Sequence, residues 1–325
     1  MLVTAVTAGT VGAVTLDLRT LASIAGSWFG FEGGHTLQQA AVLTQIRLPR
    51  IVLGLLCGGA LGLCGAVLQG LFRNPLADPG LLGITSGAGL AVGLAVVVFP
   101  AFRAALGPWA LPLAAFAGSL AAAVLVWILA RKTAREPTSA LLLAGIAVTA
   151  LSGAGTGLLI ALARDAELRD LTFWSLGSLG GATWGPLLAA LPFLVLPLPF
   201  VPWMARHLDA LLLGERDAQA LGSSVSRIRA VSLVLTAGAV GAATALSGSV
   251  GFVGLVAPHV ARLFVGHAHR FVLPLAALFG AALTVAADTV GRTLLAPAEL
   301  PLGIVLAFVG APFLLHLLFG RRRSS

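Results

Sequence analysis

Apolar runs occupy almost the whole chain, and short polar or proline-containing breaks separate them. Each run reaches about 20 residues, which is enough for a helix to cross the hydrocarbon core of a bilayer. The pattern predicts about ten transmembrane helices, at roughly 2–17, 48–70, 82–100, 108–130, 139–163, 186–205, 230–247, 250–266, 271–290 and 302–319. We therefore expect an all-α polytopic membrane protein in which residues 1–325 form a single transmembrane domain.

Composition supports this class. Apolar residues make up 58% of the chain and charged residues 10%, with a mean hydropathy of +1.01, whereas soluble domains carry roughly 25% charged residues. The net charge of +8 would suggest nucleic acid in a soluble protein. Here the arginines lie mostly at the ends of apolar runs, so the expected partner is the lipid bilayer and no nucleic acid is expected.

Catalytic and metal chemistry are not indicated. Cys57 and Cys64 are seven residues apart in one apolar run, which places them about 10 Å apart on a helix, too far for a disulfide. The sequence has no metal-ligand cluster and no phosphate-binding glycine loop, and its only lysine is Lys132. We expect no catalytic residue, no metal site and no cofactor bound by this chain.

Basic residues predict the orientation. If the C-terminus is cytoplasmic, thirteen basic residues lie on the cytoplasmic side and seven on the other, which agrees with the positive-inside rule for two cytoplasmic termini. Three of the outer arginines, Arg47, Arg50 and Arg292, lie at the outer ends of predicted helices. Asp288 precedes Arg292 by one turn, so we expect these two side chains to pair.

Two polar segments interrupt the apolar pattern on the predicted cytoplasmic side. Residues 69–88 carry two prolines, which force the chain to turn between two helices. Residues 211–222 predict a short amphipathic helix between two glycines, with Ala218 and Leu221 on one face. An exposed apolar face usually marks a docking site, although a solvated loop is the simpler alternative.

Glycines within the apolar runs predict close helix packing. Gly54, Gly58 and Gly62 repeat at four-residue spacing, a pattern that lets helix backbones approach closely in lipid. Residues 145–157 are small and mildly polar throughout, and such a surface suits a wide pathway for a large solute. No series of ionisable residues crosses the predicted membrane region, as coupled secondary carriers usually require. We therefore expect energy to be supplied by a partner.

Five blocks of sequence carry a specific resemblance, and together they span residues 47 to 319. They are 47–50, 69–88, 213–222, 251–259 with 269–270, and 299–303 followed by 310–313. In this order they resemble the permease subunits of type II ABC importers, which transport iron-siderophores, haem and vitamin B12. The resemblance implies ten helices in each subunit and an ATP-driven importer that works by alternating access.

The resemblance also implies partners and site residues. It implies a homodimer of permeases in the bacterial inner membrane, two ATPase subunits that use ATP and Mg, and a periplasmic substrate-binding protein. The binding protein would dock on Arg47, Arg50 and Arg292. The ATPase would couple through Gly214, Glu215, Arg216, Ala218, Leu221 and Gly222. The pathway or gate candidates are Asn74, Pro75, Asp78, Gly145, Thr149, Ser152, Gly153 and Thr156.

The sequence leaves three candidate substrates. The family motifs do not separate haem, ferric siderophores and cobalamin. Haem is favoured because the predicted pathway is apolar and has no internal basic cluster for an anionic siderophore. An ATPase-independent secondary carrier is the alternative from another class, and the exposed segment at 211–222 argues against it.

Overall fold

The computed structural model describes residues 1–10, 16–27, 34–131 and 137–320, and within these ranges the chain is helical with no strand. Six helical stretches are long and apolar enough to cross a membrane. Three shorter apolar helices, at Ile84–Val98, Val253–Val265 and Leu302–His316, accompany them. The predicted all-α membrane fold is confirmed.

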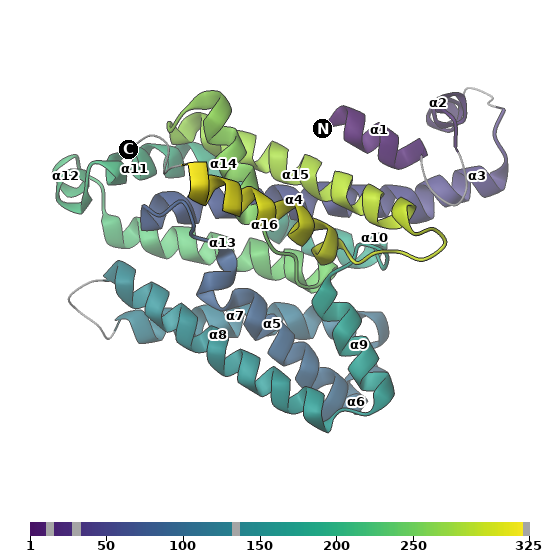
Figure 1. Cartoon of the computed structure of the whole chain (residues 1–325), viewed down its shortest axis with the longest axis horizontal. Coiled ribbons are helices and arrows are strands. Elements are labelled where there is room, and N and C mark those ends of the chain that lie inside the picture. The colour runs from purple at the N-terminus through teal and green to yellow at the C-terminus, as the bar shows by residue number, and fades with distance from the viewer. Residues whose placement is uncertain (11–15, 28–33, 132–136, 321–325) are drawn as a thin grey trace.

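Most long helices run side by side along the long axis of the molecule (Figure 1). The first half of the chain contains α1 (Leu2–Thr10), α2 (Leu18–Ser27), α3 (Leu37–Ala41), α4 (Leu48–Phe72), α5 (Ile84–Gly93), α6 (Pro100–Leu106), α7 (Ala110–Arg131) and α8 (Pro137–Leu162). The second half contains α9 (Asp165–Leu176), α10 (Trp184–Val195), α11 (Val201–Leu212), α12 (Glu215–Ala220), α13 (Val225–Ser247), α14 (Val253–Val265), α15 (His269–Leu294) and α16 (Leu302–Gly320).

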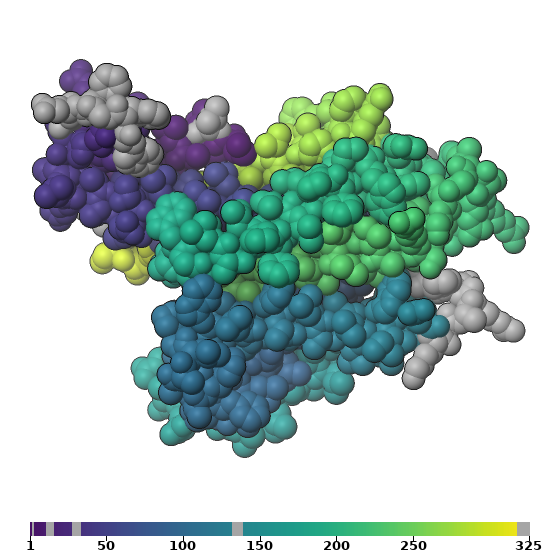
Figure 2. Space-filling model, turned by 180° about the vertical axis from the view of Figure 1, so that it is seen from behind, coloured from purple at the N-terminus to yellow at the C-terminus, as the bar shows by residue number. Residues whose placement is uncertain are grey.

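The helices form two layers. One layer holds α4, α10, α11 and α13–α16, and the other holds α5, α7 and α8 (Figure 1). Seen from behind, the blue residues of α6 and α7 lie below the teal and green residues of α10 and α11 (Figure 2). Packing of α7 and α5 against α13 joins the layers. The helix α12 and the end of α16 lie at one end of the molecule, and α3, α6 and the loop before α16 lie at the other.

Helix α4 is the centre of the first layer and is buried along nearly its whole length. A Cβ atom added at Gly62 would lie 2.2 Å from the carbonyl oxygen of Ala276 in α15, and one at Gly58 would lie 2.4 Å from that of Gly280. The glycine repeat therefore brings the backbones of α4 and α15 into contact. The predicted close packing at these glycines is confirmed.

Helix α8 of the second layer has an uncovered apolar face. Gly145 of α8 packs so closely on the turn before α5 that a Cβ atom there would lie 2.1 Å from the carbonyl oxygen of Leu81. On the other side of α8, Leu143, Leu151 and Leu158 are 67%, 68% and 62% exposed. This face is available to lipid or to another chain.

Several elements differ from the predicted bounds. The helix expected at 48–70 continues back to Leu37 through a π-helical turn at Val42–Arg47. The helix expected at 186–205 extends over Trp184–Leu212 and changes to a short 3-10 turn at Leu198–Phe200, where prolines interrupt its hydrogen bonds. The helix α9, whose first half is rich in charged residues, was not expected. The predicted first helix, at 2–17, corresponds to α1, and its residues 11–15 lie outside the described residues.

Candidate docking and coupling sites

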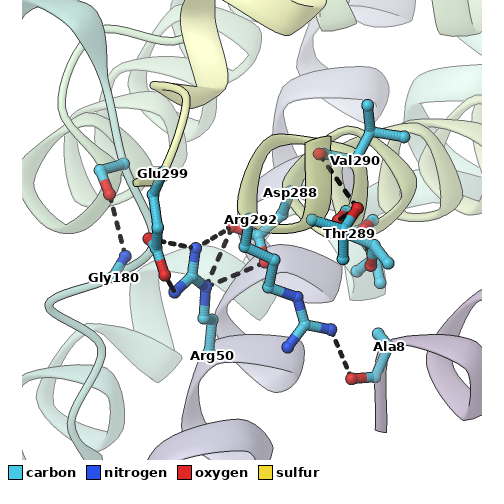
Figure 3. A network of polar contacts seen from close by, with 11 residues as sticks. Ala8, Arg50, Gly180, Asp288, Thr289, Val290, Arg292 and Glu299 are labelled. Atoms are coloured by element: carbon cyan, nitrogen blue, oxygen red, sulfur yellow. Dashed lines mark hydrogen bonds and ion pairs between the residues drawn. The ribbon is translucent and has the colours of Figure 1, made fainter. Parts of the chain in front are cut away.

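An ionic cluster joins three separate segments at one end of the bundle (Figure 3). Arg50 in the first turn of α4 directs its guanidinium at Asp288 of α15 and at Glu299 in the loop before α16. Its Nε lies 3.1 and 3.0 Å from the two carboxylate oxygens of Asp288, and its Nη2 donates to the first of them at 2.9 Å. Its Nη1 and Nη2 each donate to one oxygen of Glu299 at 3.0 Å. The planar fork of one arginine thus holds two carboxylates.

Burial differs across this cluster. The side chains of Arg50 and Asp288 are 11% and 8% exposed, whereas that of Glu299 is 46% exposed. Hydrogen bonds from the Arg50 guanidinium hold the pKa of Glu299 below its usual range. Removing one member of a buried ion pair leaves the other uncompensated, which is costly. Asp288 is therefore a structural partner of Arg50, and Glu299 is the partner that solvent can reach.

Arg47 and Arg292, the other two arginines predicted for docking, hold the C-terminal end of α1. Arg292 donates through Nη2 to the carbonyl oxygen of Ala8 (Figure 3). Arg47 is buried, and its Nη1 donates to the carbonyl oxygen of Gly9 at 2.5 Å. Cations at a helix C-terminus donate to its last carbonyl groups and interact favourably with the negative end of the helix dipole.

The expected ion pair between Asp288 and Arg292 is not among the ion pairs of the described residues, so this prediction is wrong. Arg50 from α4 occupies both carboxylate oxygens of Asp288 instead. The buried Nε of Arg292 has no hydrogen-bond partner among the described residues. Arg47 and Arg292 contact neighbouring carbonyl groups of α1, and Arg50 follows Arg47 by less than one helical turn, so the three arginines lie close together.

The opposite end carries the segment predicted for coupling. Its helix, α12, begins after Gly214 and is followed by Gly222, and both glycines have positive φ, at 117° and 83°. Such angles are accessible to glycine at little cost. Glu215 forms an ion pair with Arg229 of α13, which fixes the start of α12 to the bundle. Arg216 is exposed.

The predicted common face of Ala218 and Leu221 is wrong. Ala218 is fully buried, whereas Leu221 is 66% exposed. Leu221 is the C-cap residue of α12, and its backbone N–H still donates to the carbonyl oxygen of Asp217 at 3.0 Å. The two residues differ because the bundle covers Ala218 and does not cover Leu221. The exposed apolar residues of this segment are Leu212, Leu213 and Leu221.

The first group of pathway candidates forms the turn between α4 and α5. The Asn74 side chain accepts a hydrogen bond from the backbone N–H of Leu76 at 2.9 Å, and Pro75 is exposed. Asp78 accepts one from the N–H of Gly80 at 2.8 Å and caps the 3-10 turn. Burial raises the pKa of Asp78. These residues shape a rigid turn at the same end of the molecule as α12.

The second group lies along α8 and divides between two faces. Gly145 packs against the turn before α5, and the Thr149 hydroxyl lies 3.5 Å from the carbonyl oxygen of Gly80. Ser152 is buried, and its carbonyl oxygen accepts a hydrogen bond from the Thr156 hydroxyl at 2.9 Å. Nothing lies within 4 Å of a Cβ atom added at Gly153. Of these residues, Gly153 belongs to the uncovered face.

Sequence reasoning missed the structural partners. Glu299 and Asp288 are 249 and 238 residues from Arg50 in sequence, so no local spacing could have predicted their common arginine. The salt bridge between Arg103 and Asp170, at 2.5 Å, ties α6 to the unexpected α9. It lies beside a pocket of about 610 Å³. No group of three metal-ligating side chains occurs among the described residues.

A bundle of membrane-spanning helices that carries an ionic cluster at one end and an exposed short helix at the other defines a polytopic membrane transport protein. The model of the FecCD transport family matches residues 1–320. The chain belongs to the FecCD transport family, and it is the membrane permease of an ABC importer.

Relatives and a solved structure agree with this assignment. The chain is 42% identical to the hemin transport system permease protein HmuU of Yersinia pestis, over 100% of this chain and 94% of that protein. It is 43% identical to the cobalamin import system permease protein BtuC of Halobacterium salinarum, over 86% and 74%. An inward-facing metal-chelate type ABC transporter matches with a TM-score of 0.85 and 30% identity, over 98% and 96% of the two chains.

Proposed function

We propose that two copies of this chain enclose a pathway through the bacterial inner membrane and import haem by alternating access. ATP hydrolysis, with its Mg, belongs to two separate ATPase subunits, and a periplasmic binding protein delivers the substrate. The observation that carries the proposal is the placement of the arginine cluster and of α12 at opposite ends of one helical bundle. One end suits an acidic partner outside the membrane, and the other suits a partner in the cytosol.

Haem is the proposed substrate for two reasons. The hemin permease of Yersinia pestis aligns over the whole chain, and the face of α8 that could line a pathway is apolar. Relatives that import cobalamin and Fe(3+)-citrate keep those chelates as alternatives. The absorption spectrum of haem mixed with the cognate binding protein tests the choice. A Soret shift at stoichiometric haem supports it, and tight binding of cobalamin or a ferric siderophore in its place overturns it.

The binding protein would dock at the end of the bundle that carries Arg47, Arg50 and Arg292. Arg50 already holds a carboxylate that solvent reaches, so an acidic side chain of the partner must compete with Glu299. Charge complementarity of this kind steers encounter and fixes register. In docking, a carboxylate of the binding protein would therefore replace Glu299 on Arg50.

The ATPase would contact α12 and the exposed leucines beside it. The ion pair between Glu215 and Arg229 makes α12 move with α13, so a push on α12 is transmitted into the bundle. Capture of an ATPase subunit by the purified permease tests this assignment. Transport driven by an ion gradient, with no ATPase bound, would instead indicate a secondary carrier.

The arrangement in the membrane follows from these assignments. Both termini would be cytoplasmic, with α12 on the cytoplasmic side and the arginine cluster on the periplasmic side. The uncovered face of α8 would contribute to the pathway or to the second copy. The basic residues at 132–136 and 321–325, which support this orientation in the sequence, lie outside the described residues. Labelling of single cysteines placed at Arg216 and at Gly181 with an impermeant maleimide tests the orientation independently of transport.

A further inference from the structure

A pocket of about 330 Å³ lies between the end of α4, the end of α11, α14 and the start of α15. Its lining includes two arginines and three histidines and, among the described residues, no carboxylate. These basic residues are Arg73, His259, Arg262, His267 and His269. The lining therefore carries a charge of at least +2 even when every histidine is neutral.

The charge of Arg262 is compensated by no acidic partner among the described residues. Its Nη1 donates to the side-chain oxygen of Gln69 at 2.5 Å, and the Gln69 amide donates in turn to the carbonyl oxygen of Gly254 at 3.2 Å. Both of these partners are neutral. A half-buried guanidinium is stabilised most by a carboxylate or a phosphate, which can accept two parallel hydrogen bonds.

One of the lining histidines, His269, is held by a carboxylate that does not itself line the pocket. Asp209 of α11 accepts hydrogen bonds from the backbone N–H of His269 at 3.0 Å and from its Nδ1 at 2.7 Å. Asp209 thus fixes the buried His269 ring from behind and does not line the pocket. Arg73 is exposed at the mouth, and no ion pair of it is present among the described residues.

Apolar side chains flank the pocket. Leu212 and Leu263 line it and are 49% and 72% exposed, and Phe264 beside Leu263 is 71% exposed. A basic pocket edged by exposed apolar side chains matches a ligand that has an anionic head and apolar tails. The cytoplasmic leaflet supplies such molecules, and basic pockets between transmembrane helices on that side bind lipid head groups.

We propose that this pocket binds the phosphate of an anionic phospholipid of the cytoplasmic leaflet. Arg73 and Arg262 contact the phosphate, and the acyl chains lie along Leu263 and Phe264. Because Leu212 lies at the end of α11, two residues before Gly214, a bound lipid would also support the segment that leads into α12. The inference rests on the proposed orientation, which the cysteine labelling tests separately.

The test is native mass spectrometry of the delipidated permease–ATPase complex, titrated with dioleoylphosphatidylglycerol or with dioleoylphosphatidylcholine. The two lipids have the same acyl chains, so a difference between them reports the head group. We expect phosphatidylglycerol to bind at least tenfold more tightly than phosphatidylcholine. Each arginine near the membrane surface contributes about 1 kcal/mol to lipid binding, which is a factor of about five in affinity. Loss of both arginines should therefore lower the affinity for phosphatidylglycerol about 30-fold.

The variants are Arg73→Asn, Arg262→Gln and the double variant. Asn suits position 73 because the backbone there is left-handed, with φ of 48°. Arg73→Asn also keeps the bond between Arg262 and Gln69, so it remains informative if Arg262→Gln fails to fold. Arg131→Gln with Arg206→Gln removes two arginines elsewhere and should leave phosphatidylglycerol binding unchanged.

Three results would overturn the proposal. One is equal binding of the two lipids, and another is undiminished phosphatidylglycerol binding by the folded Arg73→Asn and double variants. The third is displacement of the lipid by inorganic phosphate at an equal anion concentration, which would assign the pocket to a soluble phosphate.

Discussion

At the scale of single residues, Arg50 carries the most consequential contacts in the molecule. It satisfies a buried carboxylate, Asp288, and an accessible one, Glu299, with a single guanidinium. Charge reversal at Arg50 is consequently a poor test of docking, because it would place a third carboxylate against the buried Asp288. Substitution of the buried Asp288 tests the role of Arg50 in folding, and substitution of the accessible Glu299 tests its proposed role in docking.

Arg50→Met should destabilise the permease by about 3–5 kcal/mol, because it leaves the buried Asp288 charge uncompensated. Arg50→Met combined with Asp288→Leu should recover most of that loss, since both charges of the buried pair are then removed. Thermal unfolding of these two purified variants and of Asp288→Leu alone gives the interaction free energy between Arg50 and Asp288. Additive effects of the two substitutions would show that the pair does not interact.

Glu299→Gln should strengthen binding of the periplasmic partner, because it removes the carboxylate that competes for Arg50 while keeping an amide of similar shape. Surface plasmon resonance of the binding protein on the reconstituted transporter measures this. We expect a several-fold gain in affinity. Asp165→Asn, an acidic residue at the start of α9 outside the cluster, serves as the control. Unchanged or weaker binding by Glu299→Gln would contradict the exchange of carboxylates.

The contact of Glu299 with Arg50 also has a defined pH dependence. The pKa of Glu299 is lowered in the folded protein, so its stabilisation is fully present above the ordinary glutamate pKa of about 4.3 and is lost as the pH falls through the lowered value. The difference in thermal midpoint between wild type and Glu299→Gln should therefore be constant from neutral pH to about 5 and should vanish in more acidic buffer. A difference that disappears near neutral pH would contradict this assignment.

Sequence alone predicted where the docking arginines lie but not what they contact. Their positions at the ends of apolar runs follow from the cost of charge in hydrocarbon. Their partners depend on which helices pack together, and Asp288 illustrates the limit. Its local neighbour Arg292 has helical spacing, yet Arg50 of a distant helix reaches it with better geometry.

At the scale of helices, the glycines of α4 set the distance to α15. Gly62→Ala should destabilise the permease by about 1–3 kcal/mol, because the added methyl overlaps the Ala276 carbonyl and the backbones must separate. Gly157→Ala in α8 is the matched control, since nothing lies within 4 Å of its added methyl. Thermal unfolding in detergent compares the two. Equal midpoints would contradict the close packing of α4 on α15.

The exposed apolar residue after α12 gives a second helix-scale prediction. Leu221→Asp should reduce ATPase binding and ATP-driven transport at least tenfold while the permease still folds, because Leu221 is 66% exposed. Leu168→Asp, an exposed leucine on α9 at the other end, should leave ATPase binding unchanged. Co-purification of the ATPase with each variant measures the effect. Retention of the ATPase by Leu221→Asp would remove α12 from the coupling interface.

Helix positions were largely predictable, because long apolar runs and glycine spacing are local signals. The helix α9 was missed because Asp165–Leu176 begins with a charged stretch and is too short to span a bilayer. The exposure of α12 was misassigned because the bundle covers Ala218 and leaves Leu221 open, and such tertiary packing has no local signal in the sequence. Bounds set by prolines and by π-helical turns depend on packing and were less predictable.

At the scale of the whole molecule, the two ends of the bundle have different chemistry. At one end, arginines lie beside the carboxylates of Asp288 and Glu299. The other end carries α12 and a basic pocket that no carboxylate of the described residues lines. Helix α4 connects them directly, since Arg50 lies in its first turn and the turn at 74–78 follows its last residue. A change in partner at one end can therefore be transmitted along a single buried helix.

The central claim is that this permease imports haem only when driven by ATP from a partner. Haem accumulation in proteoliposomes tests it most directly, with the permease, its ATPase and the haem-loaded binding protein combined in one preparation. We expect haem accumulation to require both ATP and the binding protein and to be abolished by Leu221→Asp. Haem accumulation without ATP, driven by a proton or sodium gradient, would contradict it.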